Sequence, residues 1–193
     1  MHKRFDCVRI RKTGGDSMNY ADIKRIDVAN GPGIRVSLFV SGCTHHCKNC
    51  FNAETWDFNY GKAFTNHTMD TIIEYMKPDY IKGITLLGGE PLEPSNQEGL
   101  IPLLKTIKET YPQKTIWCFT GYLFDQDILG DMWEKYPFTK EFISYIDVMV
   151  DGPFIEEQKS LNLKFKGSAN QRTILVQESL QKKEVVLYSF EEE

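Results

Sequence analysis

The sequence predicts an α/β fold in which a mostly parallel sheet is built from βαβ units. Short apolar runs that are typical of strands alternate with stretches whose apolar residues recur at helical spacing. The strand-like runs are almost wholly apolar, as expected when helices cover both faces of a parallel sheet. No internal repeat or low-complexity linker interrupts the alternation.

Strands are predicted where β-branched and apolar residues form a short run. The first run is residues 34–40 (IRVSLFV), and the cysteine-rich loop follows it directly. The later runs are residues 83–87, 115–119, 145–150, 173–176 and 185–188. Three of these runs lead directly into glycine-containing turns, which indicates that the chain reverses there.

Helices are predicted between these runs. Residues 68–77 place methionine and isoleucine at helical spacing, and Pro78 ends the pattern. Ser95 and Glu98 form a capping-box pattern that opens a helix running to about Tyr111. A weaker helical pattern covers residues 125–135.

Length and composition favour one soluble domain. The chain has 193 residues, of which 41% are hydrophobic, and this suffices for one core. The net charge of −4 does not favour a phosphate-binding surface, so we expect no nucleic-acid partner. No apolar run is long enough to span a bilayer, and we expect no membrane partner.

The N-terminal residues differ from the rest of the chain. Residues 1–17 contain Gly14-Gly15 and show no clear apolar period, so we expect a poorly ordered extension. Residues 18–193 then form a single domain, and Met1 and Met18 remain alternative starts. The extension has basic residues but lacks the apolar stretch of a signal peptide, which predicts a cytoplasmic protein.

The loops after the predicted strands carry the residues that could bind a metal or take part in a reaction. They are the cysteine-rich loop and residues 88–91 (GGEP), 120–122 (TGY) and 151–154 (DGPF). Because functional sites of parallel α/β folds collect at the carboxyl ends of the strands, we expect these four loops to converge on one rim.

Three of the five cysteines form a metal-binding pattern. Cys43, Cys47 and Cys50 have the spacing C-x3-C-x2-C. Three thiolates can ligate three irons of a 4Fe-4S cluster and leave one iron without a protein ligand. A zinc site using His45 or His46 as fourth ligand remains an alternative, because thiolates do not distinguish zinc from iron.

The remaining cysteines and the two histidines have simpler interpretations. Cys118 lies inside an apolar run and is expected to be a buried core thiol. Cys7 falls in the N-terminal extension. His45 and His46 are expected to be solvent-facing loop residues. An odd cysteine count in a chain of this kind argues against a disulfide framework.

The cysteine spacing after a strand, followed one strand later by the glycine-rich turn 88–91, resembles the radical SAM superfamily. Members of that superfamily use a 4Fe-4S cluster and S-adenosyl-L-methionine (SAM). Glycines in such a turn permit close backbone approach. The resemblance implies a partial, open (β/α) barrel with a mostly parallel sheet.

Four further segments are similar to glycyl-radical activating enzymes, and the last three of them are similar in particular to the activating enzymes of anaerobic ribonucleotide reductase. The segments are residues 30–35 (NGPGIR), 50–56 (CFNAETW), 150–154 (VDGPF) and 167–172 (GSANQR). The resemblance runs in order from about residue 18 to 176. Two positions depart from the usual pattern of the superfamily. Asn49 stands where an aromatic residue is common, although a small residue is common there in the reductase branch, and Phe51 replaces a tyrosine.

The resemblance implies a set of roles for these residues. The cluster is held by Cys43, Cys47 and Cys50, which makes them the catalytic and metal-binding residues. The methionine end of SAM is expected at Gly88, Gly89 and Glu90, with Asn49 and Phe51 lining the SAM pocket. Asp151, Phe154 and residues 170–172 either contact the partner or order the last turns of the barrel.

The implied reaction is one-electron cleavage of SAM to methionine and a 5′-deoxyadenosyl radical. That radical would take hydrogen from a glycine in the large subunit of anaerobic ribonucleoside-triphosphate reductase. The implied electron donor is flavodoxin-like. Such homolysis requires no Ser-His-Asp or paired-carboxylate pattern, and the sequence shows none.

Two other functions compete with this interpretation. One is a different radical SAM activity, either on another glycyl-radical enzyme or on a small molecule. The other is a zinc-binding interaction module without catalysis.

Overall fold

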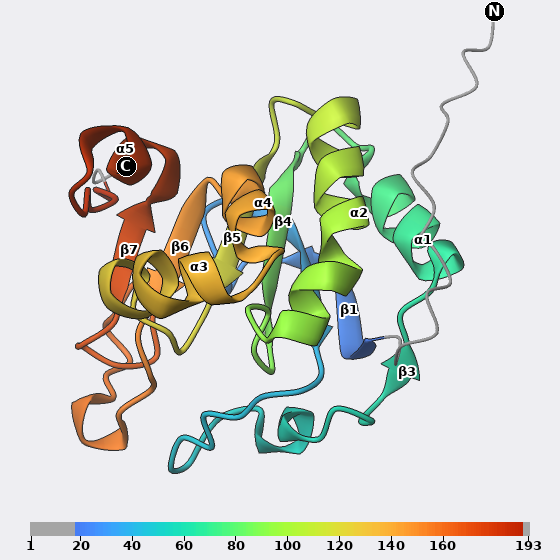
Figure 1. The fold of residues 1–193 in the computed structure, drawn as a ribbon. Helices are drawn as coiled ribbons and strands as arrows, with labels where there is room; N and C mark the ends of the chain where they lie inside the picture. The colour runs from blue at the N-terminus through green and yellow to red at the C-terminus, as the bar shows by residue number, and fades with distance from the viewer. Residues whose placement is uncertain (1–17, 191–193) are drawn as a thin grey trace, which may run out of the picture.

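The computed structural model describes residues 18–190, and the predicted extension 1–17 with Cys7 lies outside these residues. A single seven-stranded sheet organises the chain, with strand order β3-β1-β2-β4-β5-β6-β7. Its strands are β1 (Asn19–Asp27), β2 (Ile34–Val40), β3 (Lys62–Ala63), β4 (Ile81–Gly88), β5 (Thr115–Phe119), β6 (Val148–Asp151) and β7 (Arg172–Leu175). Figure 1 shows the sheet running from β3 at one edge to β7 at the other.

The middle of the sheet is parallel, as the sequence predicts. Strands β2, β4, β5 and β6 pair in parallel, whereas β1, β3 and β7 add antiparallel partners at the edges. The α/β prediction is therefore confirmed, and the observed sheet is mixed. β1 and β3 are strands that the sequence interpretation missed.

Two predicted strands differ from the observed ones. The predicted run 145–150 starts as a strand only at Val148, because Tyr145 ends a helix. The predicted strand 185–188 is wrong: the segment makes only an isolated bridge between Leu187 and Ile174. Its side chains help to cover the sheet without extending it.

The helices are α1 (Asn66–Met76), α2 (Pro94–Thr110), the π-helical η2 (Phe124–Met132), α3 (Trp133–Lys135), α4 (Thr139–Tyr145) and α5 (Val176–Lys182). The helices predicted at residues 68–77, from Ser95 to about Tyr111 and at 125–135 are present, whereas α4 and α5 were not predicted. Two short 3-10 segments, η1 (Ala53–Trp56) and η3 (Glu156–Gln158), lie in the loops. None of the helices within residues 18–190 is long and apolar enough to cross a membrane.

The residues at the N-termini of α1 and α2 explain where these helices begin. Thr65 caps α1 through a reciprocal bond with Thr68. The capping box predicted at Ser95 is wrong, because α2 already begins at Pro94, with Glu93 in the capping position. Proline is favoured in the first helical turn, since its missing N–H has no partner there in any case.

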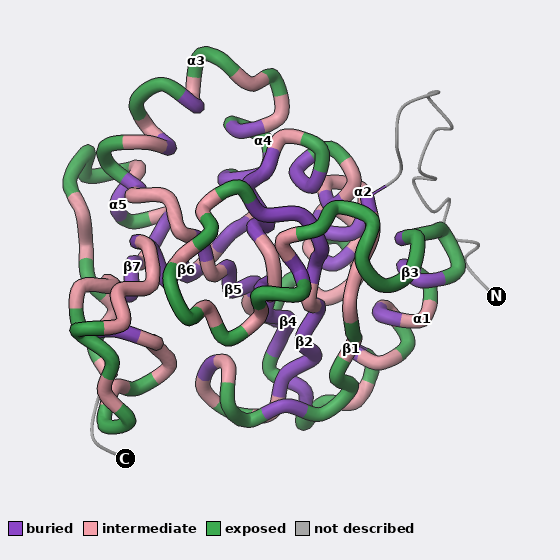
Figure 2. The backbone as a smooth tube through the Cα atoms, turned by 90° about the horizontal axis from the view of Figure 1, so that it is seen from below, coloured by how far each residue is buried: buried purple, intermediate pink, exposed green. Residues whose placement is uncertain are grey.

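The two faces of the sheet differ. In β2, Val36, Leu38 and Val40 join the main core, which also contains the buried residues of α1, α2 and α4. Strand side chains alternate, so Arg35 and Phe39 lie on the opposite face. Figures 1 and 2 show α1, α2 and α4 on one face of the sheet, so the expectation that helices cover both faces is wrong.

An aromatic cluster covers part of the second face. Trp117, Val148 and Val150 are buried there, and Phe165, Tyr188 and Phe190 pack against them. The Trp117 ring lies 5.4 Å from that of Tyr188 and 6.0 Å from that of Phe165. The C-terminal segment therefore supplies packing that a second helical layer would otherwise provide.

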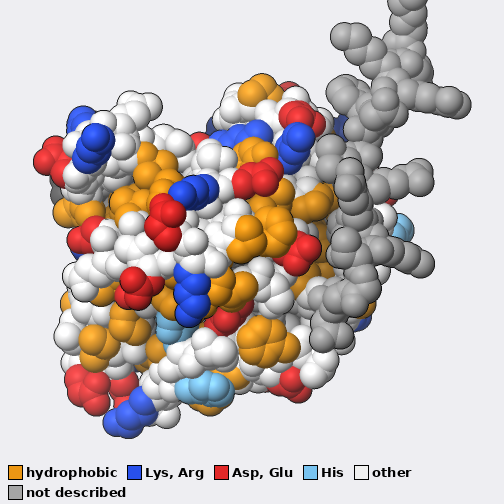
Figure 3. Space-filling view, viewed as in Figure 1, with side chains coloured by type: hydrophobic (Ala, Val, Ile, Leu, Met, Phe, Trp, Pro, Cys, Tyr) orange, Lys and Arg blue, Asp and Glu red, His pale blue; other side chains and the backbone are white. Residues whose placement is uncertain are grey.

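The helical side presents a mixed surface. Figure 3 shows acidic and basic side chains interspersed with apolar ones on this side. No large basic field is visible on this side.

Candidate functional site

A cavity of about 470 Å³ lies at the carboxyl ends of the parallel strands. This volume falls within the range of about 300–1,000 Å³ that is typical of small-molecule sites. All four predicted loops contribute to its lining, through Cys43, Cys47, Cys50, Gly88, Gly89, Glu90, Thr120, Gly121, Gly152 and Phe154. The predicted convergence of these loops on one rim is confirmed.

The cysteine loop is held at its first residues by backbone hydrogen bonds. The Ser41 N–H donates to the carbonyl of Asn19 in β1 at 3.0 Å. The Gly42 N–H donates to the Thr55 carbonyl at 2.8 Å, and the Cys43 N–H to the Trp56 carbonyl at 3.2 Å. β1 and η1 therefore hold the loop in place where it leaves β2.

The loop then turns so that all three sulfurs border the same cavity. His46 and Asn49 have positive φ angles of 49° and 54°, one in each interval between cysteines. The Cys50 N–H donates to the Cys47 carbonyl at 3.1 Å. Cys43 is buried, while Cys47 and Cys50 are partly exposed.

Two of the three thiols, those of Cys43 and Cys47, have raised pKa values. Burial raises the pKa of Cys43 to about 12, and the charges of Glu90 and Glu93 add to the effect. Burial also raises the pKa of Cys47. Such thiols are poor free nucleophiles, and a bound metal would displace their protons. The raised pKa values therefore argue against nucleophilic catalysis by Cys43 and Cys47.

These residues fit an iron–sulfur cluster. No group of three or more His, Cys, Asp or Glu side chains within residues 18–190 is already close enough to hold one metal ion. A 4Fe-4S cluster takes each thiolate at a different iron, so it does not need that tight grouping. Trp56 also lines the cavity, and its buried indole N–H has no hydrogen-bond partner among the described residues. A buried donor normally has a partner, so this one fits a cavity that receives a bound group.

The histidines do not complete a zinc site. His46 is exposed and its ring packs edge-on against Trp56 at 4.7 Å. His45 is partly buried, and its Nε2 lies 2.9 Å from Oε2 of Glu90. The expectation that both are solvent-facing is therefore wrong for His45.

The glycine-rich turn after β4 packs directly on the cysteine loop. The Gly89 N–H donates to the Val40 carbonyl and the Glu90 N–H to the Gly42 carbonyl, both at 2.8 Å. Gly88 has φ of +102°, which only glycine adopts readily. The turn and the loop thus form one backbone-bonded unit at the cavity rim.

Glu90 is almost fully buried, with 1% of its surface exposed. Its carboxylate accepts hydrogen bonds from the Leu92 N–H at 2.8 Å, the Gly121 N–H at 2.8 Å and His45 Nε2 at 2.9 Å. Burial lowers the pKa of His45, but the hydrogen bond and charge of Glu90 outweigh burial and raise it. The carboxylate of Glu90 is thus already hydrogen-bonded to other groups of the protein.

Adding a methyl group at Gly89 is expected to destabilise this unit. A Cβ there would lie 2.6 Å from the Gly42 carbonyl oxygen and 3.0 Å from that of Thr55. Because both contacts are backbone atoms, G89A should lower the free energy of unfolding by about 1–3 kcal/mol, measured by urea denaturation.

Gly99 in α2 provides the matched control for G89A. A Cβ there would meet only the flexible side chain of Met18, and alanine favours the helix. We expect a change below about 1 kcal/mol for G99A. Equal effects of the two substitutions would contradict the tight contact at Gly89.

Asn49 and Phe51 flank Cys50 and were both predicted to line the SAM pocket, but their surroundings in the structure differ. Phe51 lines the cavity, is 61% exposed and packs against Phe154 at 5.1 Å. The Asn49 side chain donates to Glu156 and is not among the cavity-lining residues. Asn49 therefore joins the loop to the segment between β6 and β7.

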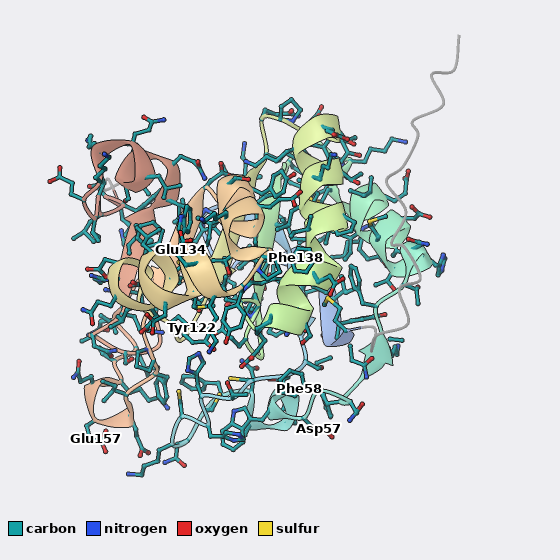
Figure 4. All side chains as sticks on the ribbon, in the orientation of Figure 1. Asp57, Phe58, Tyr122, Glu134, Phe138 and Glu157 are labelled. Atoms are coloured by element: carbon teal, nitrogen blue, oxygen red, sulfur yellow. The ribbon has the colours of Figure 1, made fainter. Side chains whose placement is uncertain are left out.

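Charged residues extend that junction. The Lys48 ammonium lies 2.9 Å from Glu156 and 3.5 Å from Glu157, and the Lys159 ammonium lies 4.7 Å from the Phe51 ring centroid. Figure 4 shows Glu157 at the end of the segment between β6 and β7, near the cysteine loop. Exposed ion pairs of this kind contribute little to stability.

The late sequence motifs order the last turns. Asp151 is fully buried, and Arg172 binds it through Nε at 3.0 Å and Nη2 at 2.5 Å. The Asn170 amide donates to the Pro153 carbonyl and the Gln171 amide to the Gly152 carbonyl. The structural interpretation of these motifs is confirmed, and Asp151 is not a surface contact.

Sequence reasoning missed several cavity residues. Lys24, Asn30, Phe39 and Lys166 also line the cavity. Alternation along β2 gives a signal for Phe39, because every second side chain of that strand faces away from the helical core. The other three come from β1 and from loops, where no periodicity marks them.

Comparisons with known proteins agree with this geometry. The protein-family model described as "4Fe-4S single cluster domain" matches residues 29–174, which include all three loop cysteines. Several relatives carry the name anaerobic ribonucleoside-triphosphate reductase-activating protein.

The relative from Vibrio cholerae is 43% identical over 80% of this chain and 96% of its own length. The one from Enterobacteria phage T4 is 41% identical over 80% and 92%. The one from Escherichia coli K12 is 40% identical over 80% and 96%. The chain therefore belongs to the 4Fe-4S single cluster domain family and to the anaerobic ribonucleoside-triphosphate reductase-activating proteins.

Proposed function

We propose that this protein is a radical SAM activase that generates a glycyl radical on the large subunit of anaerobic ribonucleoside-triphosphate reductase. One observation carries the proposal: the three cysteines border a single cavity together with the Gly88–Glu90 turn, which is hydrogen-bonded to their loop. Three thiolates would hold a 4Fe-4S cluster and leave one iron free for SAM.

Cys43, Cys47 and Cys50 would hold the cluster, which, when bound and reduced, would supply the one-electron cleavage of SAM that glycyl-radical formation requires. The chain's own residues would bind the cluster and SAM, orient them, and shield the cavity. Phe119, Phe154 and Phe165 give the cavity aromatic walls that limit water. The protein needs no general base for this chemistry.

SAM is proposed to lie in the cavity, against the unit that the cysteine loop and the Gly88–Glu90 turn form together. Gly88 and Gly89 present backbone at close range, and Phe51 offers a ring for packing. The carboxylate of Glu90 and the side chain of Asn49 are already engaged. We therefore assign any contact of these two residues with SAM to their backbone.

The fold supports the same proposal. The parallel strands β2, β4, β5 and β6 carry helices on one face (Figures 1 and 2). Residues at the carboxyl ends of these strands and in the loops that follow them line the cavity. We propose that the sheet is the open, partial (β/α) barrel of the radical SAM type. An open sheet leaves room for a protein substrate beside the cavity.

The names of the relatives identify the reductase as the partner of those proteins. We extend that partner to this chain, with a glycine-bearing loop of the large subunit as substrate. We propose a flavodoxin-like electron donor and a cytoplasmic location. Exposed Phe51 and neighbouring Phe154, at the cavity edge, would meet the incoming loop.

Electron paramagnetic resonance tests the proposal directly. Protein reconstituted anaerobically with iron and sulfide and reduced with dithionite should show a 4Fe-4S signal. Adding SAM should change the shape of that signal, because SAM binds the iron that lacks a protein ligand. The control is S-adenosylhomocysteine, a neutral thioether without the sulfonium centre, which should not be cleaved to homocysteine.

Two results would contradict the proposal. Folded, iron-loaded protein without a reduced cluster signal would exclude the cluster chemistry. A cluster signal that SAM leaves unchanged would indicate an electron-transfer or structural cluster.

A further inference from the structure

His45 occupies a position that the proposed chemistry does not use. It lies between the first two cysteines of the loop and lines the cavity. Its imidazole contacts the loops that follow two other strands, β4 and β5. This arrangement is more than surface packing, because the acceptor of its hydrogen bond is a buried carboxylate.

The contacts of His45 fix its ring on several sides. Nε2 lies 2.9 Å from Oε2 of Glu90. The ring of Tyr122, labelled in Figure 4, lies 4.4 Å away in an edge-on arrangement. A Cβ on Gly121 would lie only 2.6 Å from Cδ2 of His45, so the loop after β5 closes directly on the imidazole.

Glu90 connects these loops. Its Oε2 accepts from both His45 and the Gly121 N–H, and its Oε1 accepts from the Leu92 N–H. Glu90 also belongs to the turn whose glycines border the cavity. Backbone bonds already join this turn to Val40 and Gly42, before the first cysteine, and His45 adds a link from the part of the loop between the first two cysteines.

The geometry points to His45 as a positioning residue that sets the Gly88–Glu90 turn at a fixed distance from the cluster-binding loop. The inference rests on the proposed function, because it concerns the distance between the cluster and the residues that hold SAM. His45 would act through Glu90 and would not itself touch SAM. Its loss should weaken SAM binding while the three thiolates still hold the cluster.

A neighbouring tether of the same loop provides the matched control. The Thr44 N–H and hydroxyl bind Oε1 of Glu93 at 2.9 and 2.5 Å. This pair attaches the loop to the start of α2 without involving Glu90. A variant T44V removes the hydroxyl bond and reports on loop anchoring alone.

The experiment compares H45A, H45Q and T44V with the unmodified protein. Each is reconstituted anaerobically, and three quantities are measured: iron and sulfide per chain, the unfolding midpoint of the cluster-free chain, and the dissociation constant for SAM. The SAM-dependent change of the reduced cluster signal supplies the binding curve. Activity is not needed for any of these measurements.

We expect H45A to retain full iron and sulfide and to bind SAM at least about tenfold more weakly, which corresponds to about 1.4 kcal/mol. H45Q should recover most of the affinity, because the glutamine amide can place an N–H near the position of Nε2. T44V should bind SAM within about twofold of the unmodified protein.

The outcomes separate the inference from the proposed function. Equal loss of SAM affinity in H45A and T44V, or unchanged affinity in H45A, would overturn the positioning role. Loss of the cluster in H45A but not T44V would also overturn it, since His45 would then support the cysteines alone. Failure of the unmodified protein to bind SAM would overturn the proposed function and, with it, this inference.

Discussion

Replacing Cys43, Cys47 or Cys50 with serine is expected to remove the cluster and abolish glycyl-radical formation. The three cysteines border one cavity, and neither of the two nearby histidines is placed to substitute for a lost thiolate. Iron and sulfide should fall from about four of each per chain to well below one. Metal analysis and the reduced cluster signal measure this change.

Cys118 offers the matched control for these substitutions. It is fully buried in β5 and its side chain belongs to the core on the helical face. The variant C118S places a hydroxyl in that apolar core and should cost about 1–3 kcal/mol of unfolding free energy. Its iron content should match the unmodified protein, provided the chain is folded.

Two results would contradict this prediction. Retention of full iron in any one of the three loop variants would show that the cluster has another ligand. Loss of iron in folded C118S would place Cys118 in the site. Circular dichroism of each cluster-free variant distinguishes loss of ligation from loss of folding.

The central strands could be predicted from the sequence because their signal is local. Residues 34–40 and 115–119 match β2 and β5 at both ends. Each is a short run of β-branched and apolar residues, and buried parallel strands require little else. The cysteine loop was recognisable for a similar reason, since its three ligands lie close together along the chain.

β1 could not be predicted in this way. Its sequence NYADIKRID carries charged residues, and much of the strand is exposed. An antiparallel strand near a sheet edge gains its conformation from pairing with β2, which is a tertiary contact. The run 185–188 shows the converse: Tyr188 packs against Trp117, and the run makes two backbone hydrogen bonds and an isolated bridge to β7 without forming a regular strand.

The role of His45 could not be predicted because its partner lies 45 residues away. A histidine in a polar loop carries no periodicity that marks it as buried. The capping box at Ser95 failed for a different reason. The local pattern was present, but Pro94 already lay in the first turn of α2, which moved the start upstream.

Substitution of Arg35 is expected to have the largest effect on stability outside the cysteine loop. The side chain is 1% exposed on the face of the sheet opposite the helices. Its guanidinium donates to the hydroxyls of Thr85 at 2.8 Å and Thr115 at 3.0 Å, and to the carbonyls of Ile84 and Thr115 at 2.8 and 2.9 Å. It also lies 5.4 Å from the Trp117 ring centroid.

Arg35 joins three neighbouring parallel strands beneath the cavity. Burial lowers its pKa to about 10, yet it remains charged at neutral pH. Replacing it with alanine would leave a void and several buried acceptors without a donor. We expect R35A to lower the free energy of unfolding by about 3–5 kcal/mol, a large share of the stability of a typical domain.

Two further variants test whether the effect of Arg35 depends on its hydrogen bonds or on its charge alone. R35K retains the charge but cannot reproduce the planar fork of donors, so it should lose at least about 2 kcal/mol. R25A removes an exposed arginine of β1 that lies over Tyr75 at 5.4 Å, and it should change stability by less than about 1 kcal/mol. If urea denaturation shows R35K and R25A to be equally mild, the hydrogen bonds of Arg35 do not hold the three strands together. A large loss in R35K would instead show that the arrangement of donors, beyond the charge, supports the sheet under the cavity.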